Sequence, residues 1–209
     1  MTHPATDQKA TLRFATELDM KEIARIYALY IDTPITFDEQ PLSAQDFLVR
    51  FSQTKKLFPW LVIEQKDECG THLLGYAYAH PQHERAAYRW NAETSIYLDP
   101  HATGRGFGTL LYDTLLNLLR LLGYKMAYAL VTLPNPASEQ LHRACGFHLF
   151  GTQVYAGYTC GAWRDVAWLT KQLGSFEGTP QTPQSLEILA KQSPLHIKAL
   201  LDEANARIN

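Results

Sequence analysis

A glycine-rich turn is the segment of this sequence whose residue types and spacing most clearly suggest chemistry. Residues 99–112 read DPHATGRGFGTLLY, with Gly104, Gly106 and Gly108 between a predicted strand and a long predicted helix. Glycines at this spacing let backbone N–H groups converge, and the first helical turn adds unpaired N–H groups and the positive end of the helix dipole. Arg105 adds a positive charge. The segment predicts a phosphate-binding site; the alternative is a tight turn that merely needs glycine.

Other phosphate-binding motifs fit this turn poorly. No Lys-Ser or Lys-Thr pair follows the glycines to complete a P-loop. The chain also lacks a GxGxxG that opens a βαβ unit near the N-terminus, with an acidic residue placed to bind a ribose. The pattern therefore favours a pyrophosphate-bearing carrier that binds after the fourth predicted strand.

Two further sets of side chains have the chemistry for proton transfer or metal binding. Glu93 stands just before the fourth predicted strand, and His142 lies on a short predicted helix. By residue type alone, a solvated carboxylate and a packing or capping histidine are the ordinary interpretations. His80, His83 and Glu84 would have the spacing of zinc ligands on a helix, but a proline follows His80 at the end of a strand. We therefore expect no metal there.

Hydrophobic periodicity arranges the chain as an alternating series of strands and helices. Strands are predicted at residues 12–15, 60–64, 73–79, 94–98, 126–133, 149–156 and 165–171. Helices are predicted after the N-caps Asp19 and Ser43 and over residues 109–122, 136–144 and 188–208, with Gly123 as a C-cap. The order β-α-α-β-β-β-α-β-α-β-β predicts an α/β fold with helices packed on a mixed central sheet.

Length and composition indicate one compact domain with an appendage. The chain has 209 residues, of which 46% are hydrophobic, so it can bury a sizeable core. A formal net charge of −2 argues against a nucleic-acid partner, whose phosphates favour a basic face. The three scattered cysteines indicate a reducing compartment, and no apolar run approaches the ~20 residues of a membrane helix. With no apolar signal core near the N-terminus, we expect a cytoplasmic protein without a membrane partner.

The chain resembles the GNAT N-acetyltransferases, and within them the phosphinothricin N-acetyltransferase group. Six segments occur in the right order: YIDTPITFDEQP (30–41), FPWLVIE (58–64), ERAAYRWNAETSIYLDP (84–100), GRGFGTLLY (104–112), LPNPASEQLHRACGF (133–147) and GAWRDVAW (161–168). The similarity extends from about residue 12 to residue 173. It implies the GNAT acyltransferase fold, with an N-acetyltransferase domain over residues 1–173 and a linker and C-terminal helical extension over residues 174–209.

The resemblance also implies acetyl-CoA as the co-substrate. Acetyl-CoA would lie along the fourth strand, beside Ile96, Tyr97 and Leu98. Its pyrophosphate would rest on Gly104, Arg105, Gly106, Phe107, Gly108 and Thr109, and its pantetheine arm on Asn135 and Ser138. The family has Gln or Arg where this chain has Thr103. The shorter side chain predicts somewhat weaker CoA binding.

The implied reaction is direct attack of an amine on a thioester, which needs no nucleophile from the enzyme. An aliphatic amine is mostly protonated at neutral pH, so a positioned base must remove a proton. Glu93 matches the catalytic carboxylate of the family. His142 matches a histidine of the phosphinothricin group at a position where many relatives have Tyr. We expect His142 either to protonate the leaving thiolate or to assist Glu93, with a purely structural role as the alternative.

Four residues are implied to contact an acidic, amino-acid-like substrate: Phe37, His83, Arg85 and Tyr88. An arginine fork pairs well with a carboxylate or phosphinate. Arg85 is equally consistent with a surface arginine, and Phe37 and Tyr88 with packing residues. The phosphinothricin group has Lys at the positions of His83 and Thr159. The loss of two cations favours a neutral or singly charged substrate, such as methionine sulfone or methionine sulfoximine.

Two alternatives to a small-molecule amine acceptor stay open. A peptide or protein N-acetyltransferase would need an open groove, whereas Phe37, Trp60, Tyr88 and Trp90 suggest a walled pocket. A non-catalytic acyl-CoA-binding sensor would not need to retain Glu93. The family implies a homodimer, and the C-terminal extension is expected to dock either on its own domain or on a second subunit.

Overall fold

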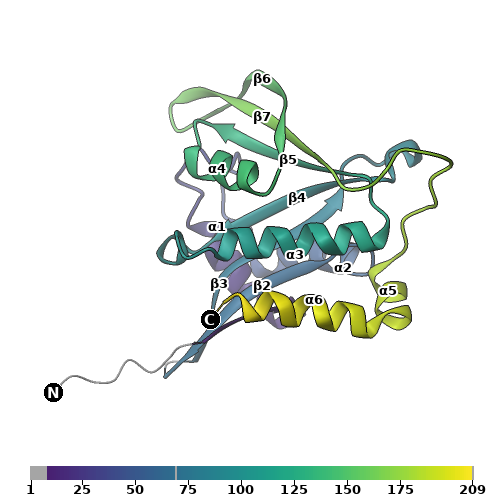
Figure 1. The fold of residues 1–209 in the computed structure, drawn as a ribbon. Coiled ribbons are helices and arrows are strands. Elements are labelled where there is room, and N and C mark those ends of the chain that lie inside the picture. Colours follow the sequence, from purple (N-terminus) through teal and green to yellow (C-terminus); the bar gives the residue numbers. More distant parts are fainter. Residues whose placement is uncertain (1–8, 69, 209) are drawn as a thin grey trace.

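One twisted, seven-stranded sheet forms the centre of the molecule (Figure 1). The computed structural model describes residues 9–68 and 70–208. The strands are β1 (Ala10–Phe14), β2 (Trp60–Asp67), β3 (Gly70–Pro81), β4 (Asn91–Leu98), β5 (Met126–Leu133), β6 (His148–Thr159) and β7 (Ala162–Gln172), in the spatial order β1-β2-β3-β4-β5-β7-β6. Neighbours are antiparallel except for β4 and β5, which run parallel. The mixed sheet predicted from the sequence is confirmed.

Helices cover both faces of this sheet. They are α1 (Met20–Ala28), α2 (Ala44–Thr54), α3 (Phe107–Leu122), α4 (Pro136–Ala144), α5 (Leu186–Gln192) and α6 (Pro194–Ala206), with short 3-10 turns η1 (Glu17–Asp19), η2 (Ala86–Tyr88) and η3 (Pro100–Ala102). Side chains alternate along β2, so that Leu61 and Ile63 join the core under α3 while Trp60 and Val62 join the core under α1 and α2. The sheet is therefore buried between two cores.

Local capping signals fix most of the helix ends. The Ser43 side chain accepts a hydrogen bond from the Asp46 N–H at the start of α2, as the sequence predicts. Gly123 ends α3 in the left-handed conformation at φ 95°. Asp19 precedes α1, but its carboxylate caps the preceding turn through the Thr16 N–H at 2.7 Å and pairs with Arg13, so the predicted side-chain cap of α1 is wrong.

The C-terminal extension forms two helices that dock on the chain itself. The single helical stretch predicted at residues 188–208 is broken at Ser193, because Pro194 starts a new helix at its first position. α6 lies alongside α3 (Figure 1), and its Ile197 joins the core under α3. The Asn205 amide accepts from the Leu12 N–H at 2.7 Å and donates to the Leu12 carbonyl at 2.9 Å. This side chain thus pairs with the backbone of edge strand β1.

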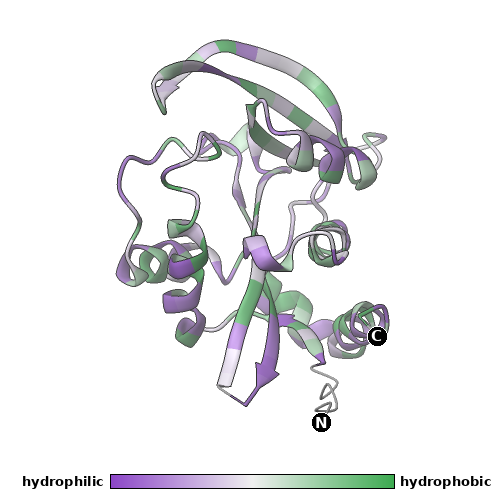
Figure 2. Ribbon diagram, turned by 90° about the vertical axis from the view of Figure 1, so that its left-hand side faces the viewer, coloured by the Kyte–Doolittle hydropathy of each residue, from purple (hydrophilic) through white to green (hydrophobic). Residues whose placement is uncertain are grey.

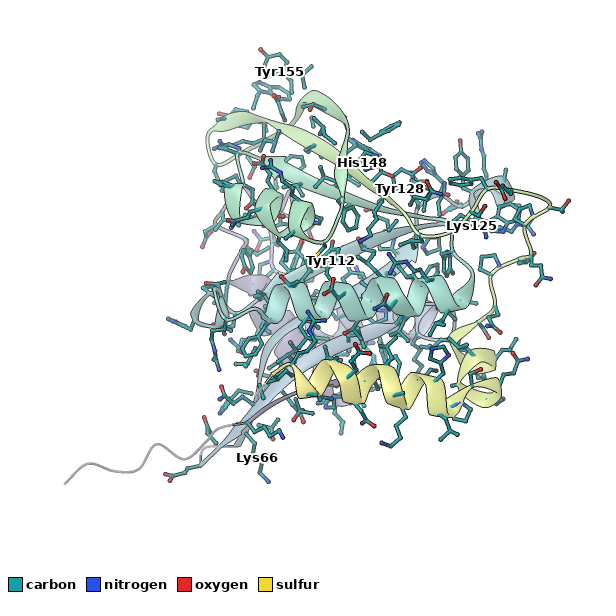
Figure 3. All side chains as sticks on the ribbon, in the orientation of Figure 1. Lys66, Tyr112, Lys125, Tyr128, His148 and Tyr155 are labelled. Carbon is teal, nitrogen blue, oxygen red and sulfur yellow. The ribbon has the colours of Figure 1, made fainter. Side chains whose placement is uncertain are left out.

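The opposite edge of the sheet, strand β6, exposes apolar side chains. Figure 2 shows the β6–β7 hairpin as a separate arch with hydrophobic segments above the rest of the molecule. The exposed fractions of Phe150, Tyr155 and Trp163 are 70%, 72% and 60%. Figure 3 shows Tyr155 pointing away from the body of the protein. Phe150 and Tyr155 lie on β6 and Trp163 on β7, so exposed aromatic side chains are spread along this hairpin at the end of the sheet.

Candidate active site

The site lies where the two parallel strands of the sheet separate. Residues 91–93 of β4 pair with residues 126–128 of β5, and beyond them the strands diverge. Thr94, the next residue of β4, donates its hydroxyl to the Tyr128 carbonyl at 3.0 Å across the start of the opening. A cavity of about 80 Å³ lies here, lined by Ile35, Glu93, Thr94, Ser95, Ile96, Tyr97, Tyr112, Leu130, Val131, Thr132, Asn135, Ser138 and His142. The divergence of β4 and β5 therefore opens the central sheet at this cavity.

Glu93 lies inside β4, at the edge of this opening. β4 begins at Asn91 rather than at residue 94, because Glu93 is paired with His80 of β3 on one side and with Tyr128 of β5 on the other. Its side chain is 24% exposed, and burial raises the pKa of Glu93 above its ordinary value of 4.5, while His80 and His83 partly offset that rise. A half-buried carboxylate with a raised pKa is suited to accept a proton near neutral pH.

The glycine turn joins β4 to α3. Gly104 and Gly106 have φ angles of 75° and 82°, which L-residues with a side chain rarely adopt. Their left-handed conformation, more than a lack of space, requires glycine here, since a Cβ would meet no atom within 4 Å at either position. Gly106 is the N-cap of α3, so the unpaired N–H groups of the first helical turn begin beside the turn. This is the geometry of an anion site.

Neighbouring residues hold the turn in place. The Asp99 carboxylate accepts a hydrogen bond from the His101 N–H at 3.0 Å and pairs with Arg25 of α1 at 2.9 Å. Thr103 donates its hydroxyl to the Pro100 carbonyl at 2.9 Å. Thr103 thus closes a local turn. The Arg105 guanidinium lies 4.6 Å from the centre of the Phe107 ring.

The other wall of the cavity is the start of α4. The Asn135 side chain accepts a hydrogen bond from the Ser138 N–H at 3.2 Å, and both residues line the cavity. The structure therefore brings Asn135, Ser138 and Glu93 to one cavity, together with Ile96 and Tyr97 of β4.

His142 is buried in a chain of hydrogen bonds that joins α4 to α3 and β4. Only 3% of the residue is exposed. Its Nδ1 donates to the Ser138 carbonyl at 2.7 Å, which leaves Nε2 to accept from the Tyr112 hydroxyl at 2.8 Å. The Tyr112 oxygen also lies 3.1 Å from the Thr94 hydroxyl. Burial lowers the pKa of His142, so the imidazole is held neutral.

Tyr112 was not among the residues predicted from the sequence. Figure 3 places it beneath α4, on the side of α3 that faces the sheet. The sequence contained one signal for it: Tyr112 is four residues after Gly108, so both lie on the same face of α3. Gly108 is where α3 packs closely on α4, since a Cβ there would lie 3.2 Å from Leu141. Burial raises the pKa of Tyr112, which keeps its hydroxyl protonated.

The residues predicted to contact the substrate do not line this cavity. His83, Arg85 and Tyr88 lie on the exposed segment between β3 and β4, where the His83 and Tyr88 rings meet edge to face at 4.7 Å. Phe37 packs against β6, so closely that a Cβ on Gly157 would lie 2.6 Å from its ring. Ile35, two residues before Phe37, lines the cavity, and the role of Phe37 in substrate binding stays a prediction.

In the described part of the chain, the candidate metal ligands do not gather and the cysteines do not pair. Within residues 9–68 and 70–208, no three His, Cys, Asp or Glu side chains gather as ligands for a metal ion. Cys145 is 3% exposed and its pKa is raised by burial to about 11, so it is a core residue as predicted. Cys160 is exposed in the β6–β7 turn, and Cys69 lies outside the described residues. In the part of the chain that the structure describes, no helix has the length and apolar character to cross a membrane.

Comparison with known proteins assigns the family. The profile of the acetyltransferase (GNAT) family matches residues 23–147, and the chain belongs to this family. It is 34% identical over 163 residues to the phosphinothricin N-acetyltransferase of Streptomyces coelicolor, which covers 78% of this chain and 95% of that protein. It is also 27% identical to the L-methionine sulfoximine/L-methionine sulfone acetyltransferase of Salmonella typhimurium. That alignment spans 165 residues and covers 78% of this chain and 94% of the relative.

A solved structure agrees with this assignment. A GNAT superfamily phosphinothricin acetyltransferase from Sinorhizobium meliloti, in complex with AcCoA, superposes with a TM-score of 0.76 at 36% identity, covering 83% of this chain and 94% of that one. The chain is therefore an N-acetyltransferase with the GNAT fold. The predicted fold class and enzyme class are both confirmed.

Proposed function

We propose that this enzyme transfers the acetyl group of acetyl-CoA to the primary amine of a small, amino-acid-like substrate of the phosphinothricin, methionine sulfone or methionine sulfoximine type. The observation that carries the proposal is the position of Glu93, half-buried where β4 and β5 separate and facing the same cavity as Asn135 and Ser138. A carboxylate in that position is suited to take a proton from an amine that enters the opening.

The residues around the cavity fit acetyl-CoA as co-substrate, which would supply the acetyl group as a thioester. The glycine turn, from Gly104 to Thr109, presents the N-terminus of α3 to a pyrophosphate. Asn135 and Ser138 offer polar groups beside Ile96 and Tyr97 for the pantetheine arm. Leu98 packs at the end of β4 next to the turn. No step of this proposal needs a metal.

In this proposal, Glu93 is the general base, and His142 positions the cavity wall through its hydrogen bond with Tyr112. Both ring nitrogens of His142 are engaged, so the imidazole holds α4 against α3 and β4. As the proton donor to the leaving thiol, His142 would have to give up its bond to the Ser138 carbonyl. We therefore assign the histidine to positioning of the cavity wall.

The substrate's acidic group would meet His83, Arg85 and Tyr88 at the exposed segment beside Glu93. This segment has two permanent positive charges, Arg85 and Arg89, and His83 stands where the phosphinothricin group has a third cation, Lys. Thr159 replaces the second lysine at the end of β6. The loss of these cations therefore favours a substrate with a neutral side chain, such as methionine sulfone or methionine sulfoximine, over phosphinothricin, which carries a phosphinate in addition to its carboxylate.

The first test is thiol release from acetyl-CoA by the purified protein with a panel of amines. The panel contains phosphinothricin, methionine sulfone, methionine sulfoximine, ordinary amino acids, polyamines and short peptides. We expect turnover with the amino-acid analogues, and faster turnover with the sulfone or sulfoximine than with phosphinothricin. Turnover with peptides alone would replace the proposal with a peptide acceptor, and acetyl-CoA binding without any turnover would replace it with a sensor.

We also propose that the enzyme is a homodimer in which β6 packs on a second copy. The support is the exposure of the aromatic side chains Phe150, Tyr155 and Trp163 along the β6–β7 hairpin at the edge of the sheet. Sedimentation of the wild type and of Tyr155→Glu tests this, since the substitution places a charge among the exposed aromatic side chains of β6. A dimer that is unchanged by Tyr155→Glu would exclude this surface.

The proposal divides the chain into an acetyltransferase domain, residues 1–173, and an extension, residues 174–209, which contains the helices α5 and α6. It places the reaction in the cytoplasm, in keeping with the few cysteines, of which Cys145 and Cys160 are unpaired.

A further inference from the structure

His80, one of the histidines with apparent metal-ligand spacing, lies against the carboxylate of Glu93. The two residues are direct partners across the antiparallel pair of β3 and β4, so their side chains are on the same face of the sheet. His80 Nε2 is 3.7 Å from Glu93 Oε1. This juxtaposition has no use in the proposed function as stated above.

The other ring nitrogen of His80 fixes which atom faces the carboxylate. Nδ1 lies 3.0 Å from the carbonyl oxygen of Pro81, which only accepts hydrogen bonds, so Nδ1 bears a hydrogen. In the neutral ring, Nε2 is then the atom without a hydrogen, and it faces Glu93. Two bare acceptors repel one another, so the contact is favourable when a proton lies between them. The pair is thus arranged to hold a proton on either member.

Both side chains of this pair are partly exposed to solvent. The Glu93 side chain is 24% exposed and the His80 side chain 32% exposed. Glu93 lines the cavity, whereas His80, its partner on the adjacent strand, does not line the cavity and is in contact with solvent. A proton taken up at the cavity therefore has a path through Glu93 to His80 and then to water.

We propose that His80 is a positioning residue that acts through Glu93, by receiving at Nε2 the proton that Glu93 removes from the substrate ammonium group and releasing it to solvent. The inference rests on the proposed function of Glu93 as the base. The amine nitrogen loses a proton to Glu93, forms the C–N bond as the C–S bond breaks, and passes its second proton to the thiolate, which leaves as the thiol. Overall one proton is released, and this is the proton that His80 carries away.

The distance of 3.7 Å is longer than a hydrogen bond and must shorten during turnover. Hydrogen bonds between catalytic groups are often long before the substrate binds and tighten in the reacting complex. The other titratable groups that act on Glu93 or respond to it are His83, whose ring packs on Tyr88, and Tyr112, which is buried and protonated. In the described part of the chain, His80 is the ion-pair partner of Glu93.

The test compares His80→Ala with His72→Ala. His72 is a matched control because it lies on the same strand and also pairs with a carboxylate, Asp67, at 3.3 Å, but outside the cavity. We expect His80→Ala to bind acetyl-CoA normally and to lose about tenfold or more in kcat for the amine, within the effect of a positioned proton acceptor. Imidazole in the buffer should restore part of this loss, and His72→Ala should behave as the wild type.

A second measurement does not depend on turnover. The titration of the Glu93 carboxyl carbon is followed by ¹³C NMR in the wild type and in His80→Ala, with His80→Gln as a substitute if the alanine variant does not fold. Because the positive charge of His80 lowers the pKa of Glu93, the midpoint should rise in the variant. An unchanged midpoint, full activity of His80→Ala or a lack of rescue by imidazole overturns the inference. A wild type that acetylates no amine would overturn the proposed function instead, while the NMR titration still decides the coupling.

Discussion

Replacement of Glu93 by Gln is the most direct perturbation of this site. Gln keeps the size and polarity of the side chain inside β4 but cannot accept a proton. An amine with a pKa near 10 is only about one part in 1,000 unprotonated at pH 7, so the variant would have to use that minor form. We therefore expect kcat/KM at pH 7 to fall by about 10²- to 10⁴-fold, the usual effect of a positioned general base.

The pH profile distinguishes a lost base from a distorted site. In the wild type, activity should fall on acidification as Glu93 is protonated, at a pH above its ordinary value of 4.5 because burial raises the pKa. In Glu93→Gln the activity should instead follow the free amine and rise about tenfold per pH unit up to the pKa of the amine, so the defect should shrink as the pH rises.

Thiol release from about pH 4.5 to 10, with acetyl-CoA binding by calorimetry as the folding check, measures both effects. Glu187→Gln, in an exposed ion pair on α5, is the control. A defect of constant size across this range, or none, would refute the assignment of Glu93 as the base.

Three further perturbations test the supports of the site. Tyr112→Phe leaves Nε2 of His142 without its donor, so the free energy of unfolding in urea should fall by about 1–3 kcal/mol. Tyr155→Phe, at an exposed position, should change this free energy little. Equal stabilities of the two variants would contradict the hydrogen-bond chain. Gly106→Ala places a side chain at φ 82°, which should cost about 1–2 kcal/mol and raise KM for acetyl-CoA in steady-state kinetics; an unchanged KM would separate the turn from CoA binding. Asn205→Ala removes both hydrogen bonds to Leu12 and should loosen α6, seen as faster amide exchange in β1 and α6; unchanged exchange would show that the apolar contacts of α6 suffice.

The order of the elements was predictable because each depends on local signals. The Ser43 capping box, the Gly123 C-cap and the alternation along β2 act within a few residues of the chain. The glycine turn was also predictable in this sense, since left-handed backbone at Gly104 and Gly106 is a local property. The residue at which a helix is interrupted was harder to predict than the helix itself. The division between α5 and α6 at Ser193 depends on Pro194, which lies in an otherwise continuous helical pattern.

The candidate site was predictable only where a motif marked it. Glu93, Asn135 and His142 stood in segments that resemble a known family, and the structure brings all three to one cavity. Tyr112 carried no such mark, because its importance comes from the contact with His142 and Thr94, which lie on other elements. The contact of Phe37 with Gly157 was not predictable either, since the two residues are distant in the chain.

The sequence by itself determined which elements form, in which order, and which residue types can bind a phosphate and move a proton. The tertiary structure decided which of those residues meet. The register of β3 against β4 places His80 beside Glu93. The divergence of β4 from β5 opens the cavity. Pairing between distant strands depends on the packing of the whole sheet between its two cores, so these contacts exist only once the chain has folded.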